Sequence, residues 1–104
     1  MIIDCHTHAW DRWPYEPKVP DPETRGTIEQ LLFEMDRNDV DKAVLVCARI
    51  DHNPHNNDYV ADCVKRYPDR IVQFADVDCS WLCSDDASFV TGSAMSVDGG
   101  WTTA

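Results

Sequence analysis

The chain has 104 residues, 43% of them hydrophobic, which suffices for one small domain and not for two. Its 19 acidic residues outnumber 9 Lys and Arg residues, and the resulting net charge of -10 repels nucleic-acid phosphates and anionic membrane surfaces. We therefore expect this chain to bind neither nucleic acid nor membranes.

The sequence also predicts a cytoplasmic location. No stretch approaches the roughly 20 apolar residues of a membrane span, and the first residues lack the basic and apolar regions of a secretory signal. The five cysteines are an odd number, which favours reduced thiols over a disulfide framework. Cys79 and Cys83 have a spacing that can suit a metal, although spacing alone is weak support.

Residues 2–8 are predicted to form a strand whose polar end is its carboxyl end. Strict alternation would place Ile2, Asp4, His6 and His8 on one face. His6 and His8, about 6.6 Å apart on a strand, can meet on one ion at Zn–N distances of about 2.0–2.1 Å. They are candidate metal ligands, whereas the pattern alone also fits polar residues at a strand end. Asp4 would either orient a ligand imidazole or accept hydrogen bonds from nearby backbone amides.

Residues 9–26 contain four prolines and three large aromatic residues, which predicts a long ordered loop. Two interpretations of Trp10, Trp13 and Tyr15 stay open. They either form a rigid wall of a substrate pocket or cover the floor of the fold or a sheet edge.

Two helices and two further strands are expected next. The first helix starts at a capping box of Thr27 and Gln30, and residues 42–47 form an apolar parallel strand. The second helix is capped at Asn57 or Asp58 and stops at Pro68, and residues 71–77 form the third strand. The expected buried positions of the helices are Ile28, Leu31, Leu32, Met35, Val60, Cys63, Val64 and Tyr67. The order β-α-β-α-β predicts an α/β fold with a parallel sheet.

Other polar residues at the same edge are weaker candidates. His52 and His55 follow the second strand and would complete a compact four-histidine site, but they also fit an ordinary polar turn before a helix. Asp76 and Asp78 would approach a metal or, as the favoured alternative, cap the next turn.

Residues 1–79 resemble the N-terminal part of the amidohydrolase-related metal-dependent hydrolases, which are (β/α)8 barrels. The matching segments are residues 3–8 with Trp10 and Asp11, residues 31–36, residues 40–46, residues 57–60 and residues 67–70. The resemblance implies that His6 and His8 bind a divalent metal, usually zinc, at the carboxyl mouth of the barrel. It is strongest to a branch containing lactone hydrolases and decarboxylases of small organic acids.

Residues 81–104 instead resemble the C-terminal tail of a short-chain dehydrogenase/reductase, which contributes a last strand. All five serines lie between Ser80 and Ser96, and no Lys or Arg follows Arg70. We therefore predict two parts, residues 1–79 and residues 80–104, joined near residues 79–81 by a deletion, a frameshifted assembly or a gene fusion. Sequencing an intact barrel gene without this junction would contradict that history.

The predicted fold is thus a partial (β/α)8 barrel with three parallel strands, plus a short C-terminal strand segment, because a whole barrel needs about 200 residues. The expected function is a truncated metal-dependent hydrolase for a small organic acid or lactone, with weakly bound zinc and little activity alone. No catalytic residue is assigned, since His6 and His8 are candidate metal ligands, and self-association through exposed sheet edges is expected. The alternatives are an NAD(P)-dependent short-chain oxidoreductase fragment and a non-catalytic fusion fragment.

Overall fold

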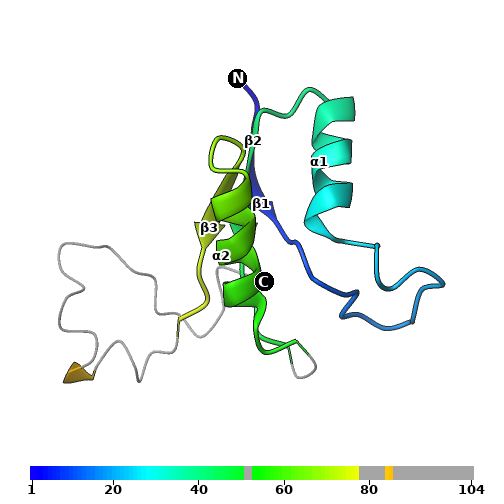
Figure 1. The fold of residues 1–104 in the computed structure, drawn as a ribbon, viewed down its shortest axis with the longest axis vertical. Helices are drawn as coiled ribbons and strands as arrows, with labels where there is room; N and C mark the ends of the chain where they lie inside the picture. The colour runs from blue at the N-terminus through cyan, green and yellow to red at the C-terminus, as the bar shows by residue number, and fades with distance from the viewer. Residues whose placement is uncertain (51–52, 78–83, 86–104) are drawn as a thin grey trace.

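Two β-α units and a third strand follow one another along the chain (Figure 1). The structure is a computed structural model that describes residues 1–50, 53–77 and 84–85. Its elements are β1 (Ile3–Thr7), α1 (Ile28–Arg37), β2 (Lys42–Val46), α2 (Asn56–Arg66) and β3 (Ile71–Phe74). The predicted β-α-β-α-β order is confirmed. The expected C-terminal strand segment lies outside the described residues.

The three strands form a parallel sheet in the order β1-β2-β3. Pairing between β2 and β3 is regular from Ala43 opposite Ile71 to Val46 opposite Phe74. Because the strands are parallel, their carboxyl ends meet at one edge of the sheet. The arrangement is that of a piece of a β/α barrel.

The register of β1 departs from strict alternation. Asp4 pairs with Ala43 and Thr7 pairs with Leu45, so three steps along β1 match two steps along β2. Such an irregularity shifts which residues share a face. The extra residue lies between Asp4 and Thr7, so the strict alternation from Asp4 to His8 that the sequence predicted does not hold along the whole of β1.

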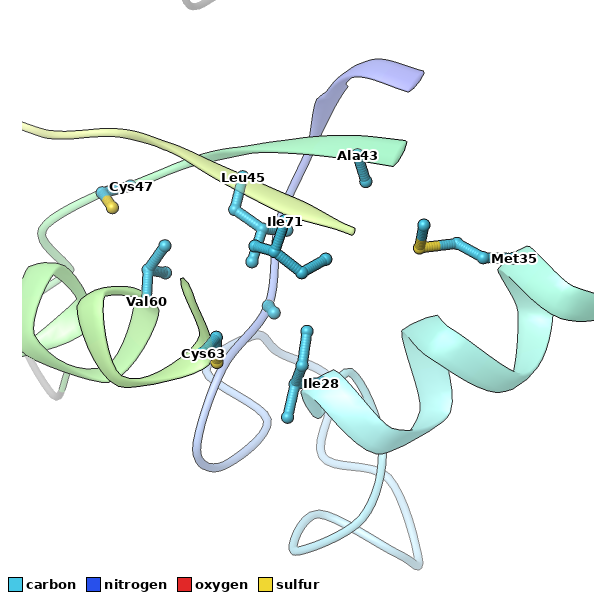
Figure 2. Close-up of a cluster of buried hydrophobic side chains, with 9 residues drawn as sticks. Ile28, Met35, Ala43, Leu45, Cys47, Val60, Cys63 and Ile71 are labelled. Carbon is cyan, nitrogen blue, oxygen red and sulfur yellow. The ribbon is translucent and has the colours of Figure 1, made fainter. Parts of the chain in front are cut away.

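Both helices pack against the same face of the sheet (Figure 2). The central strand presents Ala43 and Leu45, which are fully buried, to this face. Burial of this apolar surface is the main stabilising contribution available to so short a chain. The buried cluster consists of Ala9, Ile28, Met35, Ala43, Leu45, Cys47, Val60, Cys63 and Ile71. Leu31, Leu32, Val64 and Tyr67 pack at its margin, partly buried.

Arg70 fixes the opposite, amino-terminal edge of the sheet. Its guanidinium donates to the backbone oxygens of Asp41 at 2.8 Å and Val40 at 3.1 Å, and to Oδ1 of Asp36 at 2.9 Å. One side chain at the start of β3 thus holds the turn that links α1 to β2.

The start of α1 is where the sequence predicted it, but its cap is built differently. Thr27 is the N-cap residue and makes no side-chain capping bond. Its hydroxyl instead donates to the carbonyl of Thr24 at 2.9 Å, and Oε1 of Gln30 accepts from the amide of Gly26 at 2.7 Å. The predicted capping box is wrong because the preceding turn uses the hydroxyl.

The second helix begins earlier than predicted, and the third strand ends earlier. His55 is the N-cap of α2, so Asn57 lies inside the first turn rather than before it. Asn57 and the neighbouring Asn56 direct their side chains at strand ends instead of at the helix's own amides. β3 ends at Phe74 because Asp76 is bonded to Asn57 and not to β2. Within the described part of the chain, neither helix has the length and apolar character needed to cross a bilayer.

Tyr59 connects the two helices, and its removal should change the pH dependence of folding. Its hydroxyl accepts from the amide of Ile28 at 3.0 Å, and burial raises the pKa of Tyr59 to about 12. An ordinary tyrosine has a pKa of about 10, so the folded state holds this proton more tightly. The stabilisation is complete below pH ~10 and is lost as pH rises through about 12.

Urea unfolding at stepped pH should therefore show a steeper loss of stability from pH ~10 upward in the native chain than in Tyr59→Phe. At neutral pH the variant should be less stable by about 1 kcal/mol, because the amide of Ile28 loses its partner. Parallel pH profiles for the two proteins would contradict this role.

Candidate functional site

The carboxyl edge of the sheet gathers the polar side chains that the sequence singled out. His6 lies in β1 and His8 directly follows its last residue, while Ala48 and Asp76 follow β2 and β3. The loop after β1 and the turn before α2 surround this edge (Figure 1). The site is therefore formed where three consecutive strands end.

The structure brings the two candidate ligands together. The ring centroids of His6 and His8 are 5.2 Å apart, and the rings are inclined at 73°. His6 is exposed and His8 is half-buried. The proximity that the strand spacing predicted is confirmed, whereas metal binding itself stays a prediction.

A backbone carbonyl orients the His8 ring. Nδ1 of His8 lies 2.7 Å from the oxygen of Val46, at the end of the neighbouring strand. A carbonyl oxygen only accepts, so this bond requires the proton on Nδ1 and leaves the lone pair of Nε2 free in the neutral ring. Metal-binding histidines usually donate their other ring nitrogen in this way. The donor set of two adjacent imidazoles, one already oriented, fits a zinc-type ion as part of its coordination shell.

The carboxylate of Asp4 bonds to the backbone and not to an imidazole. Its Oδ1 accepts from the amide of His6 at 3.0 Å. Of the two interpretations of Asp4, the structure supports the backbone one.

The remaining predicted ligands do not join the pair. His55 is exposed, and its Nδ1 lies 4.0 Å from Oδ2 of Asp58. Asp76 accepts from the amide of Arg49 at 3.1 Å and pairs with that guanidinium at 3.8 Å. The described ranges, 1–50, 53–77 and 84–85, hold no cluster of three or more His, Cys, Asp or Glu residues suited to a metal. His52, Asp78, Cys79 and Cys83 lie outside these ranges.

The described cysteines are free thiols of two kinds. Cys5 is exposed, whereas Cys47 and Cys63 are buried. Burial raises the pKa of the Cys47 thiol and of the Cys63 thiol, which disfavours the reactive thiolate. Both buried thiols belong to the hydrophobic core and not to the site.

A pocket of about 550 Å³ lies between the long loop and the turn before α2, and neither His6 nor His8 lines it. Trp13 and Tyr15 line it together with Lys18, Asn53 and His55. Trp10 does not line it; this side chain is buried, with 2% of its surface exposed. The pocket-wall interpretation thus holds for two of the three aromatic residues.

Ring contacts connect the histidine pair to the pocket wall. The indole of Trp10 stacks on His8 at a centroid distance of 5.9 Å and meets Tyr15 edge-on at 5.6 Å. Tyr15 in turn contacts Trp13 at 5.1 Å. A continuous row of rings therefore runs from the candidate ligands to the pocket.

Gly26 makes the close packing of this loop feasible. Its φ of 76° lies in the region that side chains other than glycine rarely adopt. A Cβ at this position would lie 3.4 Å from Trp13 and 3.6 Å from Trp10. The carbonyl of Gly26 also accepts from the amide of Trp10 at 2.9 Å, which closes the loop.

Sequence reasoning missed the residue that joins the ends of β1 and β2 at this edge. Asn56 is buried, with 2% of its surface exposed, and bonds to the chain beyond β1 and beyond β2. Two adjacent asparagines before an apolar helix are typical of an N-cap, so the pattern concealed a role in joining strands. The burial of Asn56 is visible only in the folded chain.

Comparison with known proteins identifies the family. A family model described as amidohydrolase matches residues 3–84, and the chain belongs to that family. Searches of curated proteins and of solved structures gave no match. The match contains the whole described sheet and both helices, while the dehydrogenase-like resemblance of residues 81–104 and the boundary near residue 80 stay predictions.

Proposed function

We propose that this chain supplies the first-strand half of a divalent metal site, most simply zinc, in a hydrolase of the amidohydrolase type. The observation that carries the proposal is the His6 and His8 pair with Nδ1 of His8 held 2.7 Å from the oxygen of Val46. Family membership supports the same chemistry. A bound metal of this kind lowers the pKa of its water to about 7 and polarises a substrate carbonyl.

The residues of this chain would act by holding and orienting. His8 presents Nε2, and His6 adds a second imidazole from the exposed side. A catalytic zinc takes about three protein ligands. Since the described residues supply two candidates, we propose weak metal affinity and little hydrolysis by this chain alone. A general base is not assigned to any described residue.

Substitution of the histidines tests the metal site. Calorimetric titration of the native chain with zinc should give one weak site, and His6→Ala and His8→Ala should each reduce its affinity by about tenfold or more. The loss is expected because each variant removes one of two imidazoles.

His55→Ala serves as the matched control, since His55 is exposed and bonded to neither ring. Its zinc affinity should equal that of the native chain. Equal affinities for all four proteins would contradict the proposed site.

We further propose a small organic acid or a lactone as the substrate class. The pocket between the long loop and the turn before α2 supports this, because Lys18 supplies a cation and Trp13 and Tyr15 supply apolar walls. In the described residues Lys18 has no ion-pair partner, whereas Arg12, also at the pocket, pairs with Glu23 at 3.4 Å. A substrate carboxylate would meet the unpaired ammonium.

Tryptophan fluorescence tests the pocket with glutarate as the probe and its neutral diamide as the comparison. Lys18→Ala should weaken glutarate binding about two- to fivefold, the range of an exposed ion pair, without affecting the diamide. Lys65→Ala, on the outer surface of α2, should change neither. An unchanged response of Lys18→Ala to glutarate would remove the support for an acid substrate.

Self-association and a cytoplasmic location complete the proposal. Among the described strands, β1 and β3 are the edge strands of the sheet, and they carry the exposed side chains of Ile3, Val72 and Phe74, which favours contacts between copies. Sedimentation velocity at rising concentration should reveal association, and a constant sedimentation coefficient would contradict it. The free thiols of the described cysteines are compatible with a reducing compartment.

A further inference from the structure

Asn56 lies where two strand ends and the candidate metal site meet. Its Nδ2 donates to the carbonyl of Ala9 at 2.8 Å, and its Oδ1 accepts from the amide of Ala48 at 3.1 Å. Ala9 is the residue after His8, and Ala48 is two residues beyond Val46. One buried side chain therefore connects the end of β1 to the end of β2.

The same two strand ends are joined by the contact between His8 and Val46. The two connections close a ring. It runs from His8 to Ala9 along the chain, from Ala9 to Ala48 through the side-chain amide of Asn56, and from Ala48 back to Val46 along the chain beyond β2. If the strand ends separated, the contact between Nδ1 of His8 and the oxygen of Val46 would lengthen with them, because its two partners belong to the two strand ends.

The chemistry of the position requires an amide. The Ala9 carbonyl needs a donor and the Ala48 amide needs an acceptor, and one asparagine side chain supplies both in a fixed orientation. A leucine of similar size would leave both buried groups unpaired. An aspartate would still accept from Ala48, but as a carboxylate it has no hydrogen to offer Ala9.

We infer that Asn56 is a positioning residue for His8, which it holds in the orientation and tautomer that present Nε2 to a metal. The inference rests on the proposed function for its biological meaning, but its physical content concerns the metal-free protein. Asn56 touches neither the metal position nor the substrate pocket wall, so it acts through the strand ends.

Asn57 provides a matched control within the same helix turn. Its amide makes two comparable bonds, donating to the Asp76 carbonyl at 2.6 Å and accepting from the Asp76 amide at 2.9 Å. These bonds fix the end of β3, and Asp76 in turn accepts from the amide of Arg49 beyond β2, but neither bond reaches the end of β1, where His8 lies. A loss of stability alone should therefore appear in both variants, whereas a change at His8 should appear only in the Asn56 variants.

The experiment records imidazole nitrogen shifts of the ¹⁵N-labelled, metal-free protein at pH ~8.5, where ordinary imidazoles are neutral. In the native chain and in Asn57→Leu, His8 should be protonated on Nδ1. In Asn56→Leu it should move to the mixed tautomers of an unrestrained ring, and zinc affinity should fall about tenfold or more. Asn56→Asp keeps the size and the acceptor, and it should show the same shift if the leucine variant does not fold.

The outcomes separate this inference from the proposed function. An unchanged His8 tautomer in both Asn56 variants, or an equal change in Asn57→Leu, would overturn the positioning role. If the His8 tautomer changes only in the Asn56 variants and the native chain binds no zinc, the positioning role is supported and the proposed metal site is contradicted.

Discussion

The buried side-chain amide of Asn56 is the constraint on which the arrangement of the site depends. It joins the chain beyond β1 to the chain beyond β2, and the adjacent Asn57 joins the start of α2 to the chain beyond β3. Hydrogen bonds of the sheet itself set the strands side by side, but they do not fix the chain after the strands end. The first turn of α2 does so, and the orientation of His8 follows from it. At the opposite edge, Arg70 holds the turn between α1 and β2. Between these two edges, the helices and the sheet are held together by the packing of the buried apolar side chains.

The hydrophobic core and the polar residues of the candidate site lie in different parts of the sheet. The core residues lie on the helix-covered face, and the buried thiols of Cys47 and Cys63 contribute packing without reactivity. The histidines lie at the carboxyl edge, where the loop of residues 9–26 places a row of aromatic rings between them and a pocket. Membership of the amidohydrolase family places the same edge at the mouth of a barrel, where such enzymes have their active sites. The further elements of a complete site are not among the described residues.

Much of the fold could be predicted from the sequence because the spacing of apolar residues and the positions of helix-ending residues such as Pro68 are local signals. The apolar run of residues 42–47, the helical spacing from Ile28 to Met35 and the stop before Pro68 were enough for the element order and the parallel sheet. The proximity of His6 and His8 was predictable because residues two apart on a strand lie close together on one face. The irregular register of β1 was not, since it depends on pairing with β2. The roles of Asn56 and Asp76 could not be predicted either, because a residue that caps a helix, one that lies in a turn and one that joins two strand ends can have the same local sequence. Their burial and hydrogen-bond partners distinguish these roles, and both are set only when the chain folds.

The central claim is that His6 and His8 together bind one divalent metal. X-ray absorption spectroscopy of the zinc-loaded protein tests it most directly, because imidazole nitrogens and thiolate sulfurs lie at different distances from zinc. The account predicts two imidazole ligands at about 2.0–2.1 Å, with oxygen atoms completing the shell. A zinc shell of sulfur atoms at about 2.3 Å, or one without imidazole scattering, would contradict it.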